Sequence, residues 1–344
     1  MDTISQGNRL ELVGAPGSPY TRKMLAWLRF KRIPYAIDWS NRKINEGYPA
    51  PKVSLIPTFY LPDDNGDIEA VVDSTPIIKR LNVEFPARST TPPHPITRFL
   101  SDLVEDYADE WLTKIMFHYR WAFEEDAKNA GSLLPFFRNI QVDDNQASVL
   151  EAAFTDRQIN RLYVVGSNDV TRPIIEASYL RIIDILDKLV QRNEFVLGAR
   201  PCPADFGIFG QFTQLSQIEP TSLAILAKHS QRVRAWVMRV EDLCGLEVDD
   251  ADWFEPERAA SELRDLLAEI GRTYVPVMLA NAIAINEGKS TFEADVDGQR
   301  WAQPTFPYQA KCLQWIREAY FALDTEDRNE VMGFLDGTGC ENLI

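Results

Sequence analysis

The sequence has few basic residues and very little histidine, and both shortages exclude classes of function. Its 344 residues include 36 Lys and Arg against 51 Asp and Glu, which gives a formal net charge of −15. Binding to a phosphate backbone depends on Lys and Arg that neutralise it, so the composition argues against nucleic acid as a partner. The three histidines, His94, His118 and His229, are far from one another and from any cysteine pair. No metal site of the usual zinc pattern is therefore expected.

Paired cysteines and long apolar runs are also missing. The four cysteines form no C-x-x-C pair and are expected to be free, reduced thiols: Cys202, Cys244, Cys312 and Cys340. The longest mostly apolar run, residues 275–285, is far shorter than the roughly 20 residues of a membrane-spanning helix. Residues 1–6 lack the basic and then apolar pattern of a secretory signal. These features predict a cytoplasmic protein.

One short stretch near the N-terminus has the pattern of a ligand-binding turn. The apolar run at 10–13 is followed by Gly17-Ser18-Pro19-Tyr20-Thr21-Arg22 and then by an amphipathic segment. This order predicts a strand, a turn and a helix with Ser18 as its N-cap and Pro19 in the first turn. The unpaired N–H groups and the positive dipole end of such a helix favour an anion beside Ser18, and a thiolate is one such anion. An ordinary N-cap without further function is the alternative.

The residues around this turn predict a βαβ unit followed by a ββα unit. Ile33-Pro34 ends the first helix, and Asn65-Gly66 is typical of a hairpin turn between two strands. Asp73-Ser74-Thr75-Pro76 has the hydroxyl and the early proline of a helix start. The predicted strands are 35–39, 58–61 and 68–72, with an irregular segment over 40–57.

A proline-rich segment separates this region from a second, helical one. Four prolines in ten residues, up to Pro95, cannot continue a helix. The sequence thus predicts a domain at 1–86, a linker at 87–95 and a helical domain at 96–344. Apolar residues near helical spacing predict helices at 99–121, 174–190, 204–215, 223–240, 257–284 and 308–323.

Four of these segments together resemble the glutathione transferase superfamily. Ser18-Pro19-Tyr20-Thr21 is similar to the active-site turn of its serine-type classes, and Lys52-Val53-Ser54-Leu55-Ile56-Pro57 to its segment ending in a cis-proline. Asp73-Ser74 resembles the acidic residue and serine that receive the γ-glutamyl group of glutathione. Residues 197–206 resemble the capping segment of its C-terminal domain. The resemblance implies a thioredoxin-like N-terminal domain and an all-helical C-terminal domain.

Two features depart from the family pattern. Cys202 stands where the family usually has Ser or Thr, which weakens the reciprocal capping box with Asp205. About a hundred residues after Gly245 exceed an ordinary family member. These extra residues are expected to cover or reshape the substrate pocket, or to serve a partner.

The resemblance assigns roles to single residues. Ser18 would donate its hydroxyl to the glutathione thiolate, and the backbone at Ile56 and Pro57 would pair with the glutathione backbone. Asp73 suits the ligand's ammonium group and Ser74 a carboxylate at a helix start. Lys52 suits the glycine carboxylate, although an exposed lysine on a loop needs no function. Thr21, inside the first turn, is a poorer candidate than Ser18.

The second substrate is expected to be apolar or aromatic and to contact Tyr107 and Trp111 on the first helix of the second domain. Aromatic residues at this spacing more often belong to the core, which is the alternative. His118 on the same segment is read as structural and is not placed in the catalytic set.

The resemblance implies a glutathione-dependent transferase of the detoxification type, with glutathione as co-substrate. Its bound thiolate attacks a hydrophobic electrophile, and etherase or dehalogenase chemistry would use the same step. The alternative is a non-catalytic binding or scaffold module, because a fold does not determine a function. A homodimer is the default expectation for the family.

Overall fold

In the computed structural model, which describes residues 9–40 and 46–344, the N-terminal region forms a four-stranded sheet of order β2-β1-β3-β4. Strands β1 and β2 are parallel, and the other two pairs are antiparallel. The predicted βαβ and ββα order is confirmed. The elements of this region are β1 (Leu10–Val13), α1 (Pro19–Lys31), β2 (Tyr35–Asp38), β3 (Thr58–Pro62), β4 (Ile68–Val71) and α3 (Ser74–Glu84). Residues 41–45 of the predicted irregular segment lie outside the described residues, as do residues 1–8.

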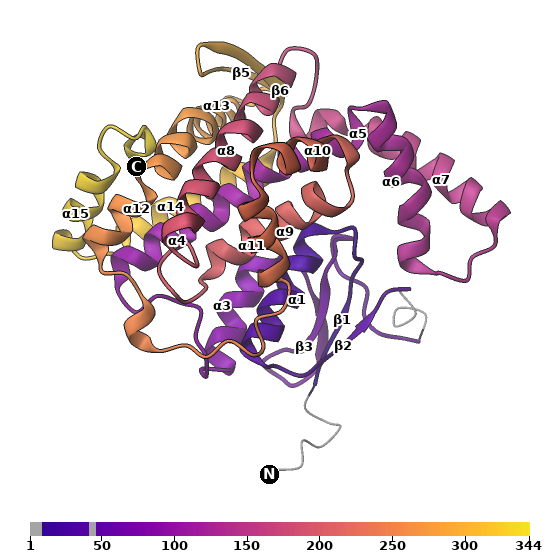
Figure 1. The fold of residues 1–344 in the computed structure, drawn as a ribbon, viewed down its shortest axis with the longest axis horizontal. Helices are drawn as coiled ribbons and strands as arrows, with labels where there is room; N and C mark the ends of the chain where they lie inside the picture. The colour runs from indigo at the N-terminus through magenta and orange to yellow at the C-terminus, as the bar shows by residue number, and fades with distance from the viewer. Residues whose placement is uncertain (1–8, 41–45) are drawn as a thin grey trace, which may run out of the picture.

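The rest of the chain is almost entirely helical, as predicted (Figure 1). The predicted helix at 99–121 is one rod with a π-helical turn at 108–112, and the one at 257–284 has a similar turn at 270–274. The predicted helix at 223–240 is two helices, because Ser230 caps a new helix through Val233 N–H. The helices are α4 (Pro95–Tyr107), α5 (Thr113–Trp121), α6 (Glu124–Arg138), α7 (Asp144–Ile159), α8 (Arg172–Arg192), α9 (Pro203–Gln217), α10 (Pro220–His229), α11 (Gln231–Val240), α12 (Pro256–Glu269), α13 (Val275–Asn286), α14 (Pro307–Phe321) and α15 (Thr325–Leu335).

One hairpin in the helical region was not predicted. Strands β5 (Thr291–Val296) and β6 (Gln299–Pro304) pair antiparallel around Asp297-Gly298. Both turn residues have positive φ, 56° and 71°, which Asp and Gly tolerate in a two-residue hairpin turn. The Asp-Gly pair between alternating apolar and polar residues is the sequence signal that could have predicted it.

The two regions share a core centred on α9, nearly all of which is buried. Helix α1 packs closely on α9 because Gly210 has no side chain there. A Cβ at Gly210 would lie 2.5 Å from the Pro19 carbonyl oxygen. The start of α9 is also capped, since Asp205 accepts hydrogen bonds from the N–H groups of Cys202 and Val196, each at 2.9 Å. Both halves of the reciprocal capping box between Cys202 and Asp205 are present, although the cysteine was expected to weaken it.

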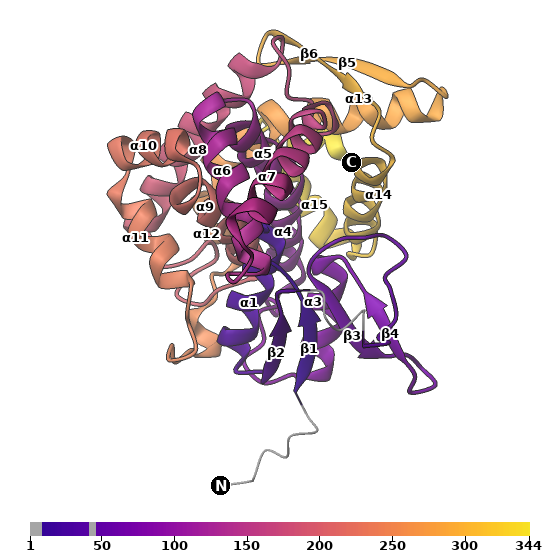
Figure 2. The same cartoon turned by 90° about the vertical axis from the view of Figure 1, so that its right-hand side faces the viewer.

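The segment from α12 to the C-terminus, here called the C-terminal extension (residues 256–344), lies along α4 and reaches the N-terminal sheet. Figure 2 shows α14 above the sheet, on the side of β3, β4 and α3. All four cysteines are free, as expected. Among the described residues, no helix is both long and apolar enough to cross a membrane.

Candidate functional site

Strand register brings three of the expected site segments to one edge of the N-terminal sheet. Val13, at the end of β1, lies opposite Thr58, at the start of β3. Phe59 lies opposite Val71, at the end of β4. The turn after β1, the Ile56-Pro57 segment before β3 and the Asp73-Ser74 pair after β4 therefore emerge at the same edge.

Ser18 is the N-cap of α1, as predicted, and its side chain is 8% exposed. The Oγ atom accepts the Thr21 N–H at 3.2 Å and donates to the Ile56 carbonyl oxygen at 3.3 Å. Pro19 has no N–H, and Arg22 N–H bonds the Ser18 carbonyl. At this helix start, the Tyr20 N–H is therefore left unpaired, because none of the described residues accepts a hydrogen bond from it. A small anion beside Ser18 would meet both a hydroxyl and this N–H group.

The turn before Ser18 is fixed by side chains from the helical region. Arg120 on α5 donates to the Gly17 carbonyl oxygen at 2.8 Å, and Gln214 on α9 donates to the Pro16 carbonyl oxygen at 3.2 Å. Arg120 also pairs with Glu219 and bonds Gln214, and all three side chains are buried. The position of Ser18 is therefore set by contacts that span 103 and 198 residues of sequence.

The segment before β3 contributes backbone groups. The Ile56-Pro57 peptide bond is cis, the form expected from the family resemblance. Lys52 is exposed on the loop before it, and its ammonium group has no partner within the described part of the chain. Its position fits a cation that is free to meet an exposed carboxylate.

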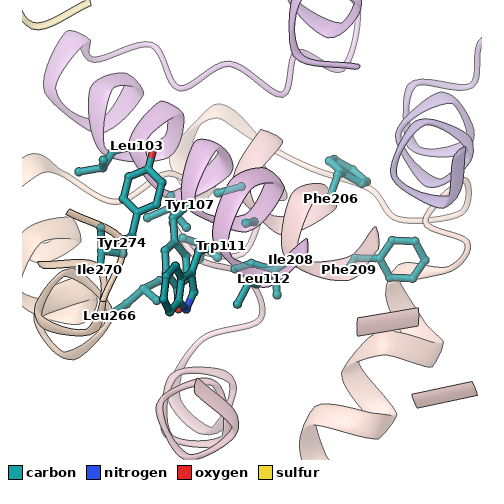
Figure 3. Close-up of a cluster of buried hydrophobic side chains, with 14 of the residues drawn as sticks. Leu103, Tyr107, Trp111, Leu112, Phe206, Ile208, Phe209, Leu266, Ile270 and Tyr274 are labelled. Carbon is teal, nitrogen blue, oxygen red and sulfur yellow. The ribbon is translucent and has the colours of Figure 1, made fainter. Parts of the chain in front are cut away.

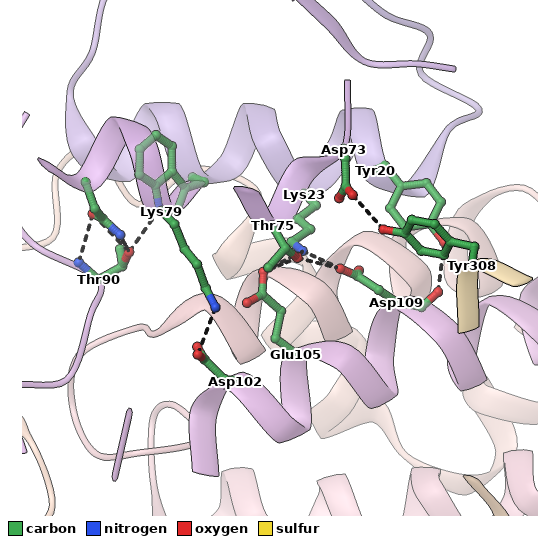
Figure 4. A network of polar contacts seen from close by, with 12 residues as sticks. Tyr20, Lys23, Asp73, Thr75, Lys79, Thr90, Asp102, Glu105, Asp109 and Tyr308 are labelled. Atoms are coloured by element: carbon green, nitrogen blue, oxygen red, sulfur yellow. Dashed lines mark hydrogen bonds and ion pairs between the residues drawn. The ribbon is translucent and has the colours of Figure 1, made fainter. Parts of the chain in front are cut away.

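Asp73 and Ser74 form the start of α3. Asp73 has φ of +82°, a conformation that non-glycine residues rarely adopt and that clusters at functional sites. Its carboxylate does not cap its own helix. Instead Asp73 Oδ2 accepts the Tyr308 hydroxyl of α14 at 2.6 Å (Figure 4). The N–H groups of Ser74 and Thr75 have no acceptor among the described residues, so this helix start can receive a carboxylate.

A buried charge network lies behind this edge and was missed in the sequence. Lys23 Nζ lies 2.7 Å from Glu105 Oε1 and 2.6 Å from Asp109 Oδ2, and Thr75 Oγ1 is within hydrogen-bond distance of both carboxylates (Figure 4). Burial opposes the charge on Lys23, but Asp109 and Glu105 outweigh it and raise the pKa of Lys23. The network ties α1 and α3 to α4.

Two further carboxyl groups beside this network face the C-terminal extension. Burial raises the pKa of Asp106 to about 7 and that of Glu110 to about 8. Asp106 accepts a hydrogen bond from the Tyr274 hydroxyl, and Gln309 of α14 donates to the Glu110 carbonyl oxygen at 3.4 Å. The extension therefore covers an acidic face of the helical domain.

Tyr107 and Trp111, the expected substrate contacts, are both 0% exposed and belong to the core (Figure 3). The Tyr107 ring packs edge-on against Tyr274, and Trp111 packs against Trp301 and donates to Ser178 Oγ at 2.9 Å. Both aromatic partners, Tyr274 and Trp301, come from the extension. In this structure the two side chains have no surface that a ligand could reach, because the extension fills the space beside them. His118 is also buried and contacts Ser167 Oγ at 2.8 Å.

Comparison with known proteins identifies the N-terminal domain. Residues 12–89 match the family of the glutathione S-transferase N-terminal domain. No curated protein matches the chain.

Several solved structures are similar to the chain at low identity. A glutathione S-transferase from Methylobacterium radiotolerans, in complex with glutathione sulfonate, is 19% identical over 70% of this chain and 98% of its own, with a TM-score of 0.36. A tau-class enzyme from mango is 17% identical over 74% and 96%, with a TM-score of 0.40. A glutathione S-transferase from Rhodospirillum rubrum is 15% identical over 73% and 98%, with a TM-score of 0.41. The domain match therefore assigns residues 12–89 alone, as a glutathione S-transferase N-terminal domain.

Proposed function

We propose that the protein is a glutathione-dependent transferase whose bound thiolate is stabilised by Ser18. The observation that carries this proposal is the shared sheet edge. There the Ser18 hydroxyl and the Tyr20 N–H stand beside the Ile56 backbone and near the α3 N-terminus. This edge offers a donor pair for a sulfur anion, a backbone for the peptide and a helix start for a carboxylate.

Each proposed contact follows from the charge of its group. Asp73 would pair with the ammonium group of the γ-glutamyl moiety, and Ser74 with its carboxylate. Lys52 would meet the glycine carboxylate as a point charge. Ser18 would turn its O–H from the Ile56 carbonyl to the sulfur, which becomes the better acceptor once it is charged.

The chemistry is nucleophilic substitution at carbon. A free thiol with a pKa of about 8.5 is only a few per cent thiolate at neutral pH, and the thiolate is the nucleophile. Lowering that pKa by about two units needs about 2.7 kcal/mol of differential stabilisation, which a hydroxyl and a helix start can supply. The thiolate then forms a C–S bond as the leaving group departs with the bonding electron pair, and the thiol proton goes to solvent.

A second candidate function, a binding or scaffold module, is favoured by the C-terminal extension. The extension buries Tyr107 and Trp111, where a hydrophobic electrophile was expected, and places Tyr308 on Asp73. Such a module would retain glutathione or a related peptide without activating its thiol.

Calorimetric titration with glutathione tests the proposal first. We expect saturable binding of one molecule per chain, and weaker binding by an Asp73→Asn variant. Glu69→Gln, on the exposed face of β4, is the control. An absence of saturable binding would contradict both the transferase and the glutathione-binding module. A cytoplasmic location, a homodimer and a detoxification role stay predictions.

A further inference from the structure

The start of α14 brings a tyrosine from the C-terminal extension into the proposed site. Tyr308 Oη lies 2.6 Å from Asp73 Oδ2, across 235 residues of sequence. Burial and the nearby Asp73 carboxylate raise the pKa of Tyr308, so its hydroxyl remains a hydrogen-bond donor. Asp73 Oδ1 has no hydrogen-bond partner among the described residues. One carboxylate oxygen is thus fixed by the extension and the other is left for a ligand.

Tyr308 is held rigidly in this position. The fully buried Asn281 of α13 accepts the Phe306 N–H at 2.8 Å and donates to the Phe306 carbonyl oxygen at 2.9 Å. The Tyr308 ring packs against Phe306 and edge-on against Trp315. These contacts fix the backbone just before Tyr308 and the position of its ring, so the tyrosine forms a wall of the site.

Acidic side chains near Asp73 give the Tyr308 hydroxyl a function. Burial and, with other nearby charges, the Asp73 carboxylate raise the pKa of Asp109. The two carboxyl groups are therefore close enough to repel each other when both are charged. A neutral donor on Oδ2 stabilises the Asp73 carboxylate and fixes its orientation without occupying Oδ1.

We propose that Tyr308 is a positioning residue of this site, supplied by the C-terminal extension, which orients Asp73 so that Oδ1 receives the ammonium group of the γ-glutamyl moiety. The inference rests on the proposed function, since it concerns the same ligand. It makes the extension a determinant of ligand selectivity at the γ-glutamyl end.

Calorimetry with two ligands tests it: glutathione, and the analogue in which hydrogen replaces the α-ammonium group. We expect the wild-type protein to prefer glutathione. Tyr308→Phe keeps the ring and its packing, and we expect it to reduce that preference by about tenfold, the size typical of one hydrogen bond to a charged group. Asp73→Asn should abolish most of the preference, and adding Tyr308→Phe to it should have little further effect. Tyr320→Phe is the matched control, because it removes a hydroxyl from the same helix that bonds the Arg328 carbonyl oxygen instead.

The outcomes separate this inference from the proposed function. An unchanged preference in Tyr308→Phe would overturn the positioning role, and an increased preference would show that the tyrosine competes with the ligand; both leave glutathione binding intact. Wild-type protein that binds both ligands equally would remove Asp73 as the ammonium site, while thiol activation by Ser18 stays testable. Wild-type protein that binds neither would refute both the proposed function and this inference.

Discussion

The Ser18 hydroxyl holds the turn before α1 together, and in the proposed function it also donates to the bound sulfur. Its oxygen accepts a hydrogen bond from the Thr21 N–H, which stabilises the helix start, and its O–H donates a hydrogen bond to the Ile56 carbonyl oxygen. To bind a thiolate, Ser18 has only to turn its O–H from the Ile56 carbonyl oxygen to the sulfur. The hydrogen bond from the Thr21 N–H, which caps the helix, can therefore persist when the ligand is present. This is why an N-cap serine can serve structure and chemistry together.

Lys52 supplies a test at the surface of the site. If it meets the glycine carboxylate, Lys52→Met should weaken glutathione binding about threefold at low salt, and the difference should shrink in high salt because exposed charges are screened. Lys289→Met, at an exposed lysine paired with Glu287, is the control. Calorimetry at two salt concentrations measures both. Equal affinities for wild type and Lys52→Met at low salt would remove Lys52 from the site.

Lys23 tests the buried network. Lys23→Met leaves Glu105 and Asp109 buried without their cation, so we expect the free energy of unfolding to fall by about 3–5 kcal/mol. Lys188→Met, which breaks only an exposed pair with Asp184 on α8, should leave it nearly unchanged. Urea denaturation of both variants gives the comparison. Equal stability of the two variants would show that the network contributes nothing.

The buried position of Lys23 could not be predicted from its local sequence. A lysine on an amphipathic helix is normally assigned to solvent, and Lys23 is buried only because Glu105 and Asp109 arrive from α4 and the π-helical turn that follows it. The helix-start positions of Ser18, Asp73 and Ser74 could be predicted because turns and helix starts have local sequence signals. Tyr308 has no such signal, since its contact with Asp73 depends on how α14 docks.

At the scale of elements, local sequence signals predicted most helices. Where these signals missed a helix or a helix break, the reason is physical. The break at Ser230 depends on a capping hydroxyl inside a continuous apolar pattern. Helix α7 buries only Ala147, so it shows little of the periodicity that predicts a helix. The π-helical turns change the local hydrogen bonding without interrupting the rod, and the apolar pattern does not show them.

The contact between α1 and α9 gives a test at this scale. Gly210→Ala places a Cβ 2.5 Å from the Pro19 carbonyl oxygen, and α1 cannot move freely because Arg120 and Gln214 hold the preceding turn. We expect a loss of about 1–3 kcal/mol in the free energy of unfolding and weaker glutathione binding.

The matched control is Gly333→Ala in α15, where a Cβ would meet no atom within 4 Å. It should stabilise the protein by about 0.5–1 kcal/mol, because alanine favours a helix interior. Thermal and urea unfolding distinguish the two. A Gly210→Ala variant as stable as Gly333→Ala would mean that α1 and α9 can separate at little cost.

For the whole molecule, docking of the extension over buried carboxyl groups predicts a pH dependence. The Asp106 pKa is about 7 in the folded protein, raised by burial, against about 4 in an unfolded chain. Between about pH 4 and pH 7 the folded state keeps a proton that the unfolded state has released. The contribution of Asp106 to the free energy of unfolding therefore falls as the pH rises. Tyr274, Asp109, Cys312 and Glu105 influence this carboxyl group. Asp106 also interacts with Glu110, whose pKa it helps to raise.

Asp106→Asn removes the titration and keeps an acceptor for Tyr274. The free energy of unfolding of the wild type relative to this variant should fall by about 2 kcal/mol from pH 5 to pH 7, as measured by urea denaturation at each pH. Comparing the two proteins cancels the opposite contribution of His118, whose pKa burial lowers to about 4. Asp265→Asn, at an exposed position of α12, is the control. Its free energy of unfolding should depend on pH in the same way as that of the wild type. The prediction would be contradicted if the free energy of unfolding of Asp106→Asn also followed the same pH dependence as that of the wild type.

The ultraviolet absorbance of the glutathione thiolate, followed against pH with and without the protein, tests the central claim most directly. If Ser18 stabilises the bound thiolate, the bound thiol ionises about one to three pH units below the free one, and Ser18→Ala loses most of that shift. A bound thiol that ionises at its free value, or a shift that Ser18→Ala retains, would contradict the claim; saturable binding without a shift would favour the binding module.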